Sequence, residues 1–147
     1  MGGTPNMLPQ HGMSYSIECA QTPGMCVDIR GSLRTNGADA TNYQRNGGAN
    51  QKFKVHKGPT GFQLFAHHSN MALGVRNRER GALVEQRKEQ DSSIWNIQPS
   101  GDGFFYINMT GTNLYMEIEH GDTHNGAKLV LNNQTGQYNQ KWKFSPF

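Results

Sequence analysis

Apolar and polar residues alternate in short stretches along this chain, and the same succession of stretches occurs three times. Alternation with a period of two is typical of β-strands that bury one face. The first stretch of each copy covers residues 15–19, 61–65 and 104–108. After a turn rich in Gly, Asn, Thr or Ser, the second stretch covers residues 25–29, 71–75 and 114–118. No helical period extends over a useful length, so the pattern predicts an all-β protein.

Each copy then continues through a polar loop that ends in a Gly-Ala pair, followed by a third short strand and a closing motif. The closing motifs occupy residues 50–53, 92–95 and 139–142, and each ends in an aromatic residue. These aromatic residues, Phe53, Trp95 and Trp142, lie 42 and 47 residues apart. Four strands in each of three copies predict twelve strands at the spacing of an all-β barrel.

A single copy cannot cover its own apolar face, so three copies must pool their faces around one axis. The sequence therefore predicts a β-trefoil of three four-stranded repeats with pseudo-threefold symmetry. We expect one domain over residues 14–147, with repeats at about 14–58, 59–102 and 103–147, and a flexible tail over residues 1–13.

The closing motif has a structural role in this prediction. Its aromatic side chain should point inward, and its Gln amide should satisfy backbone groups of the neighbouring turn. The apolar partners expected around the three aromatic side chains are Val27, Ile29, Leu73, Val75, Met116 and Ile118.

The closing motifs resemble the Gln-x-Trp signature of the ricin-type β-trefoil lectins. They appear here as Gln51 to Phe53, Ser93 to Trp95 and Gln140 to Trp142. The segment 26–29, Cys-Val-Asp-Ile, is similar to the segment that supplies a sugar-binding carboxylate in that family. The resemblance covers about residues 15–147. It implies shallow sugar pockets built from a carboxylate, a stacking aromatic and the amide pair of the closing motif.

Carried over by position, the resemblance implies a complete set in the first repeat: Asp28, Tyr43, Asn50 and Gln51. The third repeat has a weaker set, with Glu117, Asn132, Asn139 and Gln140, and His120, Asp122 or His124 as substitute contacts. In the second repeat Gly74 replaces the acid, Arg87 the aromatic, and Ser92 and Ser93 the amide pair, so we expect no sugar site there.

Simpler roles remain open for three of these residues. The carboxylate of Asp28 could bond only to its own loop, as Asp often does at strand ends. Tyr43 could be a packing aromatic, and Glu117 a solvated strand residue.

Composition narrows the function classes. The chain has 147 residues, of which 34% are hydrophobic and 17% charged, with a net charge of +3. No apolar run is long enough to span a membrane. No secretory signal is visible in residues 1–12. We therefore expect that the chain is cytoplasmic, that it is exported by a non-classical route and acts on extracellular glycans, or that it is an excised module. Cys19 and Cys26 flank a turn and could be bridged or remain as packed thiols.

The segment from Arg76 to Lys88 is the one basic cluster, which is compatible with a solvated face or with binding of a sulfated glycan. His67, His68, His120 and His124 lie in predicted turns, where their spacing does not suit a metal. No catalytic constellation or phosphate-binding loop is evident, and no cofactor is expected.

We therefore predict a non-catalytic, carbohydrate-binding lectin with a galactose or N-acetylgalactosamine preference that is implied by the resemblance. The expected partners are glycans or glycoconjugates, without nucleic acid and without membrane insertion. Because one shallow site binds weakly, useful avidity needs several sites per chain or a homo-oligomer. The alternatives are a protein-interaction or protease-inhibitor trefoil, and a heparin-type binder that uses the basic cluster.

Overall fold

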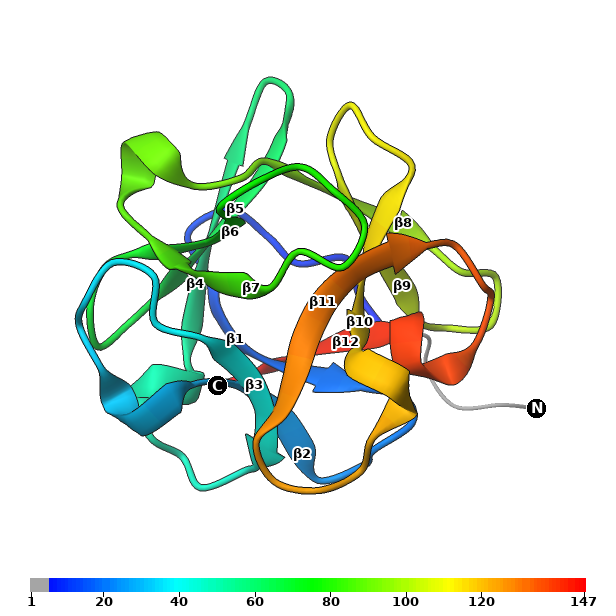
Figure 1. Cartoon of the computed structure of the whole chain (residues 1–147), viewed down its shortest axis with the longest axis horizontal. Coiled ribbons are helices and arrows are strands. Elements are labelled where there is room, and N and C mark those ends of the chain that lie inside the picture. The colour runs from blue at the N-terminus through cyan, green and yellow to red at the C-terminus, as the bar shows by residue number, and fades with distance from the viewer. Residues whose placement is uncertain (1–5) are drawn as a thin grey trace.

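Twelve β-strands and five single-turn 3-10 helices make up residues 6–147, the part of the chain that the computed structural model describes (Figure 1). The strands are β1 (Ser14–Cys19), β2 (Met25–Ile29), β3 (Ala40–Gln44), β4 (Phe53–Gly58), β5 (Gly61–Ala66), β6 (Ala72–Val75), β7 (Val84–Arg87), β8 (Trp95–Pro99), β9 (Phe105–Met109), β10 (Leu114–Ile118), β11 (Ala127–Asn133) and β12 (Trp142–Pro146). The 3-10 helices are η1 (Arg30–Ser32), η2 (Ala49–Gln51), η3 (Glu89–Asp91), η4 (Glu119–Gly121) and η5 (Tyr138–Gln140).

Six of the strands close a barrel, since each pairs in antiparallel fashion with two others. Following the pairs around the ring gives the order β1, β4, β5, β8, β9 and β12. The ring therefore alternates the first and fourth strands of the three repeats. Closure leaves the barrel without free edges.

The other six strands form three hairpins, β2–β3, β6–β7 and β10–β11. Adjacent hairpins contact one another through Ala127 opposite Asn42, and through bridges that join Asp39 to Glu85 and Leu83 to Val130. Figure 1 shows the loop between β6 and β7 reaching over to β11, where Gly81 N–H donates to the Leu131 carbonyl over 2.7 Å. A six-stranded barrel with three hairpins is the predicted β-trefoil, which is confirmed.

The predicted core is also confirmed. The aromatic side chains of Phe53, Trp95 and Trp142 are fully buried, and all six of their expected apolar partners belong to the same buried cluster. The two indoles are held further by hydrogen bonds, from Trp95 Nε1 to the Leu73 carbonyl (3.3 Å) and from Trp142 Nε1 to the Met116 carbonyl (3.1 Å). Phe53 fills the same place with no donor.

The N-terminal segment predicted as a flexible tail is only partly described, because residues 1–5 lie outside the described residues. In the remainder, Gly12 N–H donates to the Val55 carbonyl (2.8 Å) and Gln10 N–H to the Tyr15 hydroxyl (2.9 Å). These contacts place residues 10–13 against β1 and β4. The flexibility itself stays a prediction.

The two thiols are free and buried, so the packed-thiol alternative holds. Cys19 Sγ donates to the carbonyl of Tyr138 over 3.3 Å. Burial raises the pKa of Cys19 to about 12 and that of Cys26 to about 11. Within residues 6–147, no helix has the length and apolar character needed to cross a membrane.

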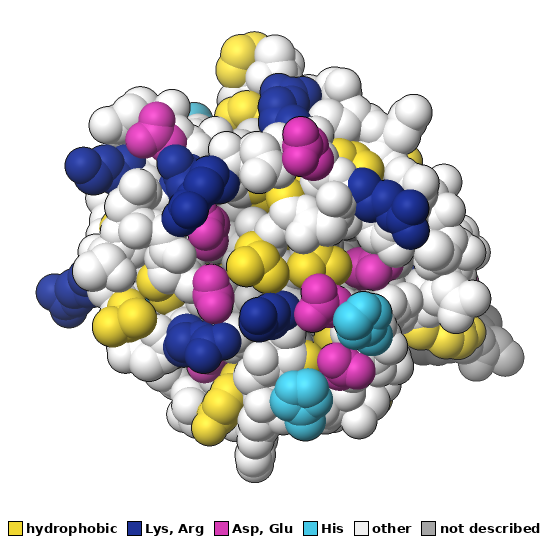
Figure 2. All heavy atoms as spheres, viewed as in Figure 1, with side chains coloured by type: hydrophobic (Ala, Val, Ile, Leu, Met, Phe, Trp, Pro, Cys, Tyr) yellow, Lys and Arg dark blue, Asp and Glu magenta, His cyan; other side chains and the backbone are white. Residues whose placement is uncertain are grey.

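The basic cluster predicted from the sequence is divided in the structure. Arg87 pairs with Glu85, Arg80 donates to Asn132 over 2.9 Å, and Arg78 donates to the Thr110 carbonyl over 2.9 Å. On the face shown in Figure 2, Lys and Arg side chains are accordingly interspersed with Asp and Glu. Arg78, Arg80 and Arg87 therefore contact different parts of the molecule.

Candidate functional site

The first repeat places a carboxylate at the end of β2. Asp28 is 5% exposed, and its Oδ2 accepts a hydrogen bond from Gln51 Nε2 over 2.9 Å. Desolvation by burial raises the pKa of Asp28, and hydrogen bonds from Gln51 and Asn50 oppose that effect. The side chain thus bonds to the closing motif, 23 residues away, and the hypothesis that it bonds only to its own loop is wrong.

The amide pair of the first closing motif connects this acid to the scaffold. Gln51 also donates to the Gln44 carbonyl (3.0 Å) and accepts from Asn46 N–H (2.9 Å), which confirms the predicted link to the neighbouring turn. Asn50 donates to the Ile29 carbonyl over 3.0 Å, immediately beyond Asp28. Both amides therefore hold the end of β2 in place.

Tyr43 lies on the same face of the β2–β3 hairpin as Asp28. Thr41 is the partner of Asp28 in the ladder, and Tyr43 follows two residues later, where side chains return to the same face. Its side chain is 40% exposed. The structure therefore places an accessible aromatic residue on the same face of the hairpin as the acid.

The third repeat reproduces the acid and amide arrangement with a longer side chain. Glu117 Oε1 accepts from Gln140 Nε2 over 2.9 Å, and Asn139 Nδ2 donates to the Ile118 carbonyl over 3.0 Å. Gln140 also bonds to the Asn133 carbonyl (2.7 Å) and to Thr135 N–H (2.8 Å). Glu117 is only 6% exposed, so the hypothesis of a solvated strand residue is wrong.

An amide occupies the aromatic position of the third repeat. Asn132 Nδ2 lies 3.1 Å from each carboxylate oxygen of Glu117, and Asn132 Oδ1 accepts from Arg80 Nε over 2.9 Å. Arg80 belongs to the second repeat. This bridge orients the carboxylate but offers no ring on which a sugar could stack.

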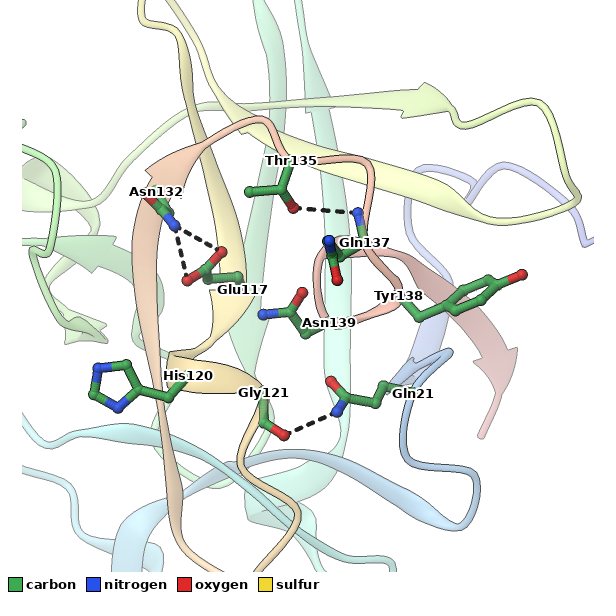
Figure 3. A pocket seen from close by; sticks show the side chains of 9 residues that line it. All are labelled: Gln21, Glu117, His120, Gly121, Asn132, Thr135, Gln137, Tyr138 and Asn139. Carbon is green, nitrogen blue, oxygen red and sulfur yellow. Dashed lines mark hydrogen bonds between the residues drawn. The ribbon is translucent and has the colours of Figure 1, made fainter.

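A cavity of about 470 Å³ opens beside Glu117 (Figure 3). It is lined by Gln21, Glu117, His120, Gly121, Asn132, Thr135, Gln137, Tyr138 and Asn139. Of the candidate loop residues, His120 is in this lining, and Asp122 and His124 are not. Gln140 is not in this lining and is fully buried.

Sequence reasoning missed five of the lining residues, and two of these, Gln21 and Tyr138, matter most for the site. Gln21 comes from the β1–β2 turn of the first repeat, and its Nε2 donates to the Gly121 carbonyl over 2.8 Å, across 100 residues. No local pattern could have placed it there. Tyr138 is 60% exposed and directly precedes the amide pair, a position that could have marked it. Lys141 Nζ lies 4.9 Å from the centre of its ring.

The second repeat has no carboxylate at the equivalent place on β6. A Cβ on Gly74 would lie 3.0 Å from the backbone nitrogen of Ser93 and 3.1 Å from Ser92 Cα, so the closing segment fills that space. The nearest acid, Glu85, lies opposite Gly74 on β7 and pairs with Arg87 over 2.6 Å. This repeat therefore differs in both shape and charge.

No group of three or more His, Cys, Asp or Glu side chains in the part of the chain from residue 6 onward could hold a metal ion.

The family model of the ricin-type beta-trefoil lectin domain matches residues 14–142. Comparison with curated protein sequences gives no match. Among solved structures, the designed threefold-symmetric protein ThreeFoil is 25% identical, with a TM-score of 0.84 over 91% of this chain and 99% of that chain.

Two natural lectins are also similar in structure. A ricin B-like lectin of Macrolepiota procera, solved in complex with lactose, is 20% identical, with a TM-score of 0.85 over 96% of this chain and all of that chain. The C-half of an earthworm R-type lectin, solved in complex with GalNAc, is 17% identical, with a TM-score of 0.71 over 92% of this chain and 99% of that chain. At these identities the likeness establishes the fold.

Proposed function

Because the chain belongs to the ricin-type β-trefoil lectin family, we propose that it is a non-catalytic lectin that binds galactose or N-acetylgalactosamine through its first and third repeats. One observation carries this proposal. In both repeats a nearly buried carboxylate at the end of the second strand accepts a hydrogen bond from the closing Gln over 2.9 Å. An acid held in this way is oriented before a ligand arrives, which lowers the entropic cost of binding.

In the first repeat the proposed contacts divide among three side chains. Asp28 accepts hydrogen bonds from two neighbouring hydroxyls, because charged acceptors make the stronger bonds. Tyr43 covers the C–H face of the ring, and Asn50 contributes a polar contact beside the acid. Gln51 is fully buried, so its role is to position Asp28.

In the third repeat the cavity beside Glu117 receives the sugar. Glu117 supplies the acceptor, while Asn132 and Asn139 form polar walls on either side of it (Figure 3). Gln140 is fully buried and positions Glu117, as Gln51 positions Asp28. Because Asn132 stands where the first repeat has the aromatic ring of Tyr43, the sugar has less apolar contact here. This site should therefore bind the sugar more weakly than the first.

The choice of sugar rests on similarity. The Macrolepiota procera lectin was solved with lactose and the earthworm lectin with GalNAc, and both share the fold. Two weak sites on one chain would raise avidity towards extracellular glycans that carry several copies of the sugar, and a homo-oligomer would raise it further.

A glycan array at two salt concentrations tests the proposal, followed by titration of galactose and N-acetylgalactosamine. Asp28→Asn should abolish first-repeat binding, Glu117→Gln third-repeat binding, and the double variant both. Glu79→Gln, which alters an exposed acid, is the matched control. Full binding by the double variant, or no binding of either sugar by the unaltered protein, would contradict the proposal.

A further inference from the structure

A second cavity, of about 510 Å³, opens in the second repeat, where the sequence predicts no sugar site. Its lining includes Ser92 and Ser93, which occupy the places that Asn139 and Gln140 take in the third repeat. It also includes Arg76 and Arg78 from the β6–β7 loop, and Thr110 from the turn after β9. The closing segment fills the space beside Gly74, so this cavity is a separate hollow among the closing segment, the β6–β7 loop and the turn after β9.

The acid opposite Gly74 on β7, Glu85, is already paired with an arginine. Arg87 Nη1 lies 2.6 Å from Glu85 Oε1, and both side chains are largely buried, at 15% and 6% exposure. Gly74 contributes no side chain, and the adjacent backbone leaves no room for one. A neutral sugar would thus meet no free acceptor from the hairpin, which removes the main contact proposed for the other two repeats.

Two arginines line the cavity, and little compensates their charge. Arg78 Nη2 donates to the Thr110 carbonyl over 2.9 Å, a neutral acceptor that fixes the side chain and leaves its charge intact. Arg76 Nε lies 3.9 Å from Glu85 Oε1, which Arg87 already neutralises, and the Arg76 side chain is 76% exposed. Asp91 is the opposing acid in the lining, so the cationic groups outnumber the anionic one.

Hydroxyl groups complete the wall. Ser92, Ser93 and Thr110 all line it. The Ser92 hydroxyl already donates to the Glu89 carbonyl over 2.8 Å, and Thr110 Oγ1 is buried, so Ser93 is the hydroxyl donor proposed for a ligand. Guanidinium groups beside a hydroxyl suit an oxyanion, because Arg presents N–H groups in a fixed fork.

We propose that the second-repeat cavity binds the oxyanion substituent of an acidic sugar, either a sulfate ester or a carboxylate. The oxyanion lies between Arg76 and Arg78, and the sugar ring lies against Ser92 and Ser93. This proposal depends on the proposed function only because it assumes that the charged group belongs to a sugar. The protein would then have two sites for a neutral sugar and one site for an acidic sugar.

The test follows backbone amide NMR signals during titration with galactose 6-sulfate, galacturonic acid, galactose and inorganic sulfate. The acidic sugars should shift the signals of Ser92, Ser93 and Thr110, and galactose should not. Raising the salt concentration should weaken this binding by roughly threefold or more, since charges near the surface are screened. Inorganic sulfate should bind at the same residues but more weakly than the sulfated sugar.

Three variants separate the charge contributions. Arg76→Gln, at a side chain that is 76% exposed and 3.9 Å from Glu85, should weaken binding of the sulfated sugar by about threefold. Arg78→Gln should weaken it further, and Asp91→Asn should strengthen it by removing repulsion. Arg34→Gln, at an exposed arginine outside the cavity lining, is the control.

Unchanged affinity in Arg76→Gln and Asp91→Asn would overturn the proposal, even if Arg78→Gln fails to fold. Equal affinity for inorganic sulfate and the sulfated sugar would overturn the assignment of a sugar. Galactose binding that survives in the first and third repeats while the acidic sugars fail to bind would sink this inference alone. Loss of galactose binding with retained sulfate binding would sink the proposed function instead.

Discussion

Gln51 donates a hydrogen bond from its side-chain amide to the carboxylate of Asp28, with 2.9 Å between the two atoms. The donor precedes Phe53 in the closing motif, and the acceptor is the penultimate residue of β2. One short motif therefore supplies both an aromatic residue to the core and an amide that orients the candidate sugar-binding acid. Gln140 and Glu117 repeat the relationship with the same separation along the chain and the same distance.

Replacing Gln51 with Ala should destabilise the protein by about 3 kcal/mol. The amide bonds to Asp28, to the Gln44 carbonyl and to Asn46 N–H, and these buried groups would lose their partner. Urea unfolding followed by tryptophan fluorescence measures the loss. Gln134→Ala, at an exposed position, is the control and should change stability by less than about 0.5 kcal/mol. Equal effects of the two substitutions would show that the amide has no structural role.

Asp28→Asn should separate binding from stability. Asn keeps an oxygen that can accept from Gln51, and it removes the charge whose burial raises the pKa of this group. We expect unfolding stability at neutral pH to be equal to or higher than that of the unaltered protein, while first-repeat sugar binding is lost. A marked loss of stability would mean that the charge itself is required by the scaffold.

The pH dependence should reveal the same acid. Since the pKa of Asp28 is raised above its ordinary value of 3.8 in the folded protein, the folded state binds this proton more tightly than the unfolded state. The contribution of Asp28 to stability should therefore fall as the pH rises from 3.8 through the folded pKa.

Urea midpoints of the protein and of Asp28→Asn between acidic and neutral pH measure this contribution. The stability advantage of the variant should grow through that window. First-repeat sugar binding should weaken as the pH is lowered, because acidification protonates the carboxylate of Asp28. A constant difference between the two proteins across this range would contradict the assignment.

Gly74→Asp should fail to rebuild a sugar site in the second repeat. The new Cβ would lie 3.0 Å from the backbone nitrogen of Ser93, so the closing segment must shift, at a cost of about 2 kcal/mol. Thermal unfolding and galactose titration measure the two effects. Gly58→Ala is the matched control, because its Cβ would have a nearest neighbour at 3.9 Å. A stable variant that gains galactose binding would refute the steric argument.

The two cysteines should resist alkylation until the chain unfolds. Burial raises their pKa values to about 12 and about 11, so few thiolates form at neutral pH and the reagent has no access. Mass spectrometry after brief iodoacetamide treatment should find no modification in buffer and two in concentrated guanidinium chloride. Rapid labelling in buffer would show that local opening exposes them.

Much of the architecture could be predicted because its signals are local and repeated. The strand boundaries expected at 25–29 and 114–118 match β2 and β10, whereas β9 begins one residue later than expected. Asp28 and Glu117 could be proposed because their positions correspond, by resemblance, to the sugar-binding carboxylate of the ricin-type lectins. The hydrogen bonds of Asn132 to Glu117 and Arg80 could not, because they depend on how the third-repeat side chain meets a loop of the second repeat.

The sequence by itself determined the number of strands, the threefold repeat and the aromatic residues of the core, since alternation and spacing are properties of the linear chain. Only the tertiary structure decided which repeats contain a cavity and which residues line it. Gln21 reaches the third-repeat cavity from the first repeat, and Thr110 reaches the second-repeat cavity from the third. Packing around the axis sets such neighbours, because it brings together turns that are distant along the chain.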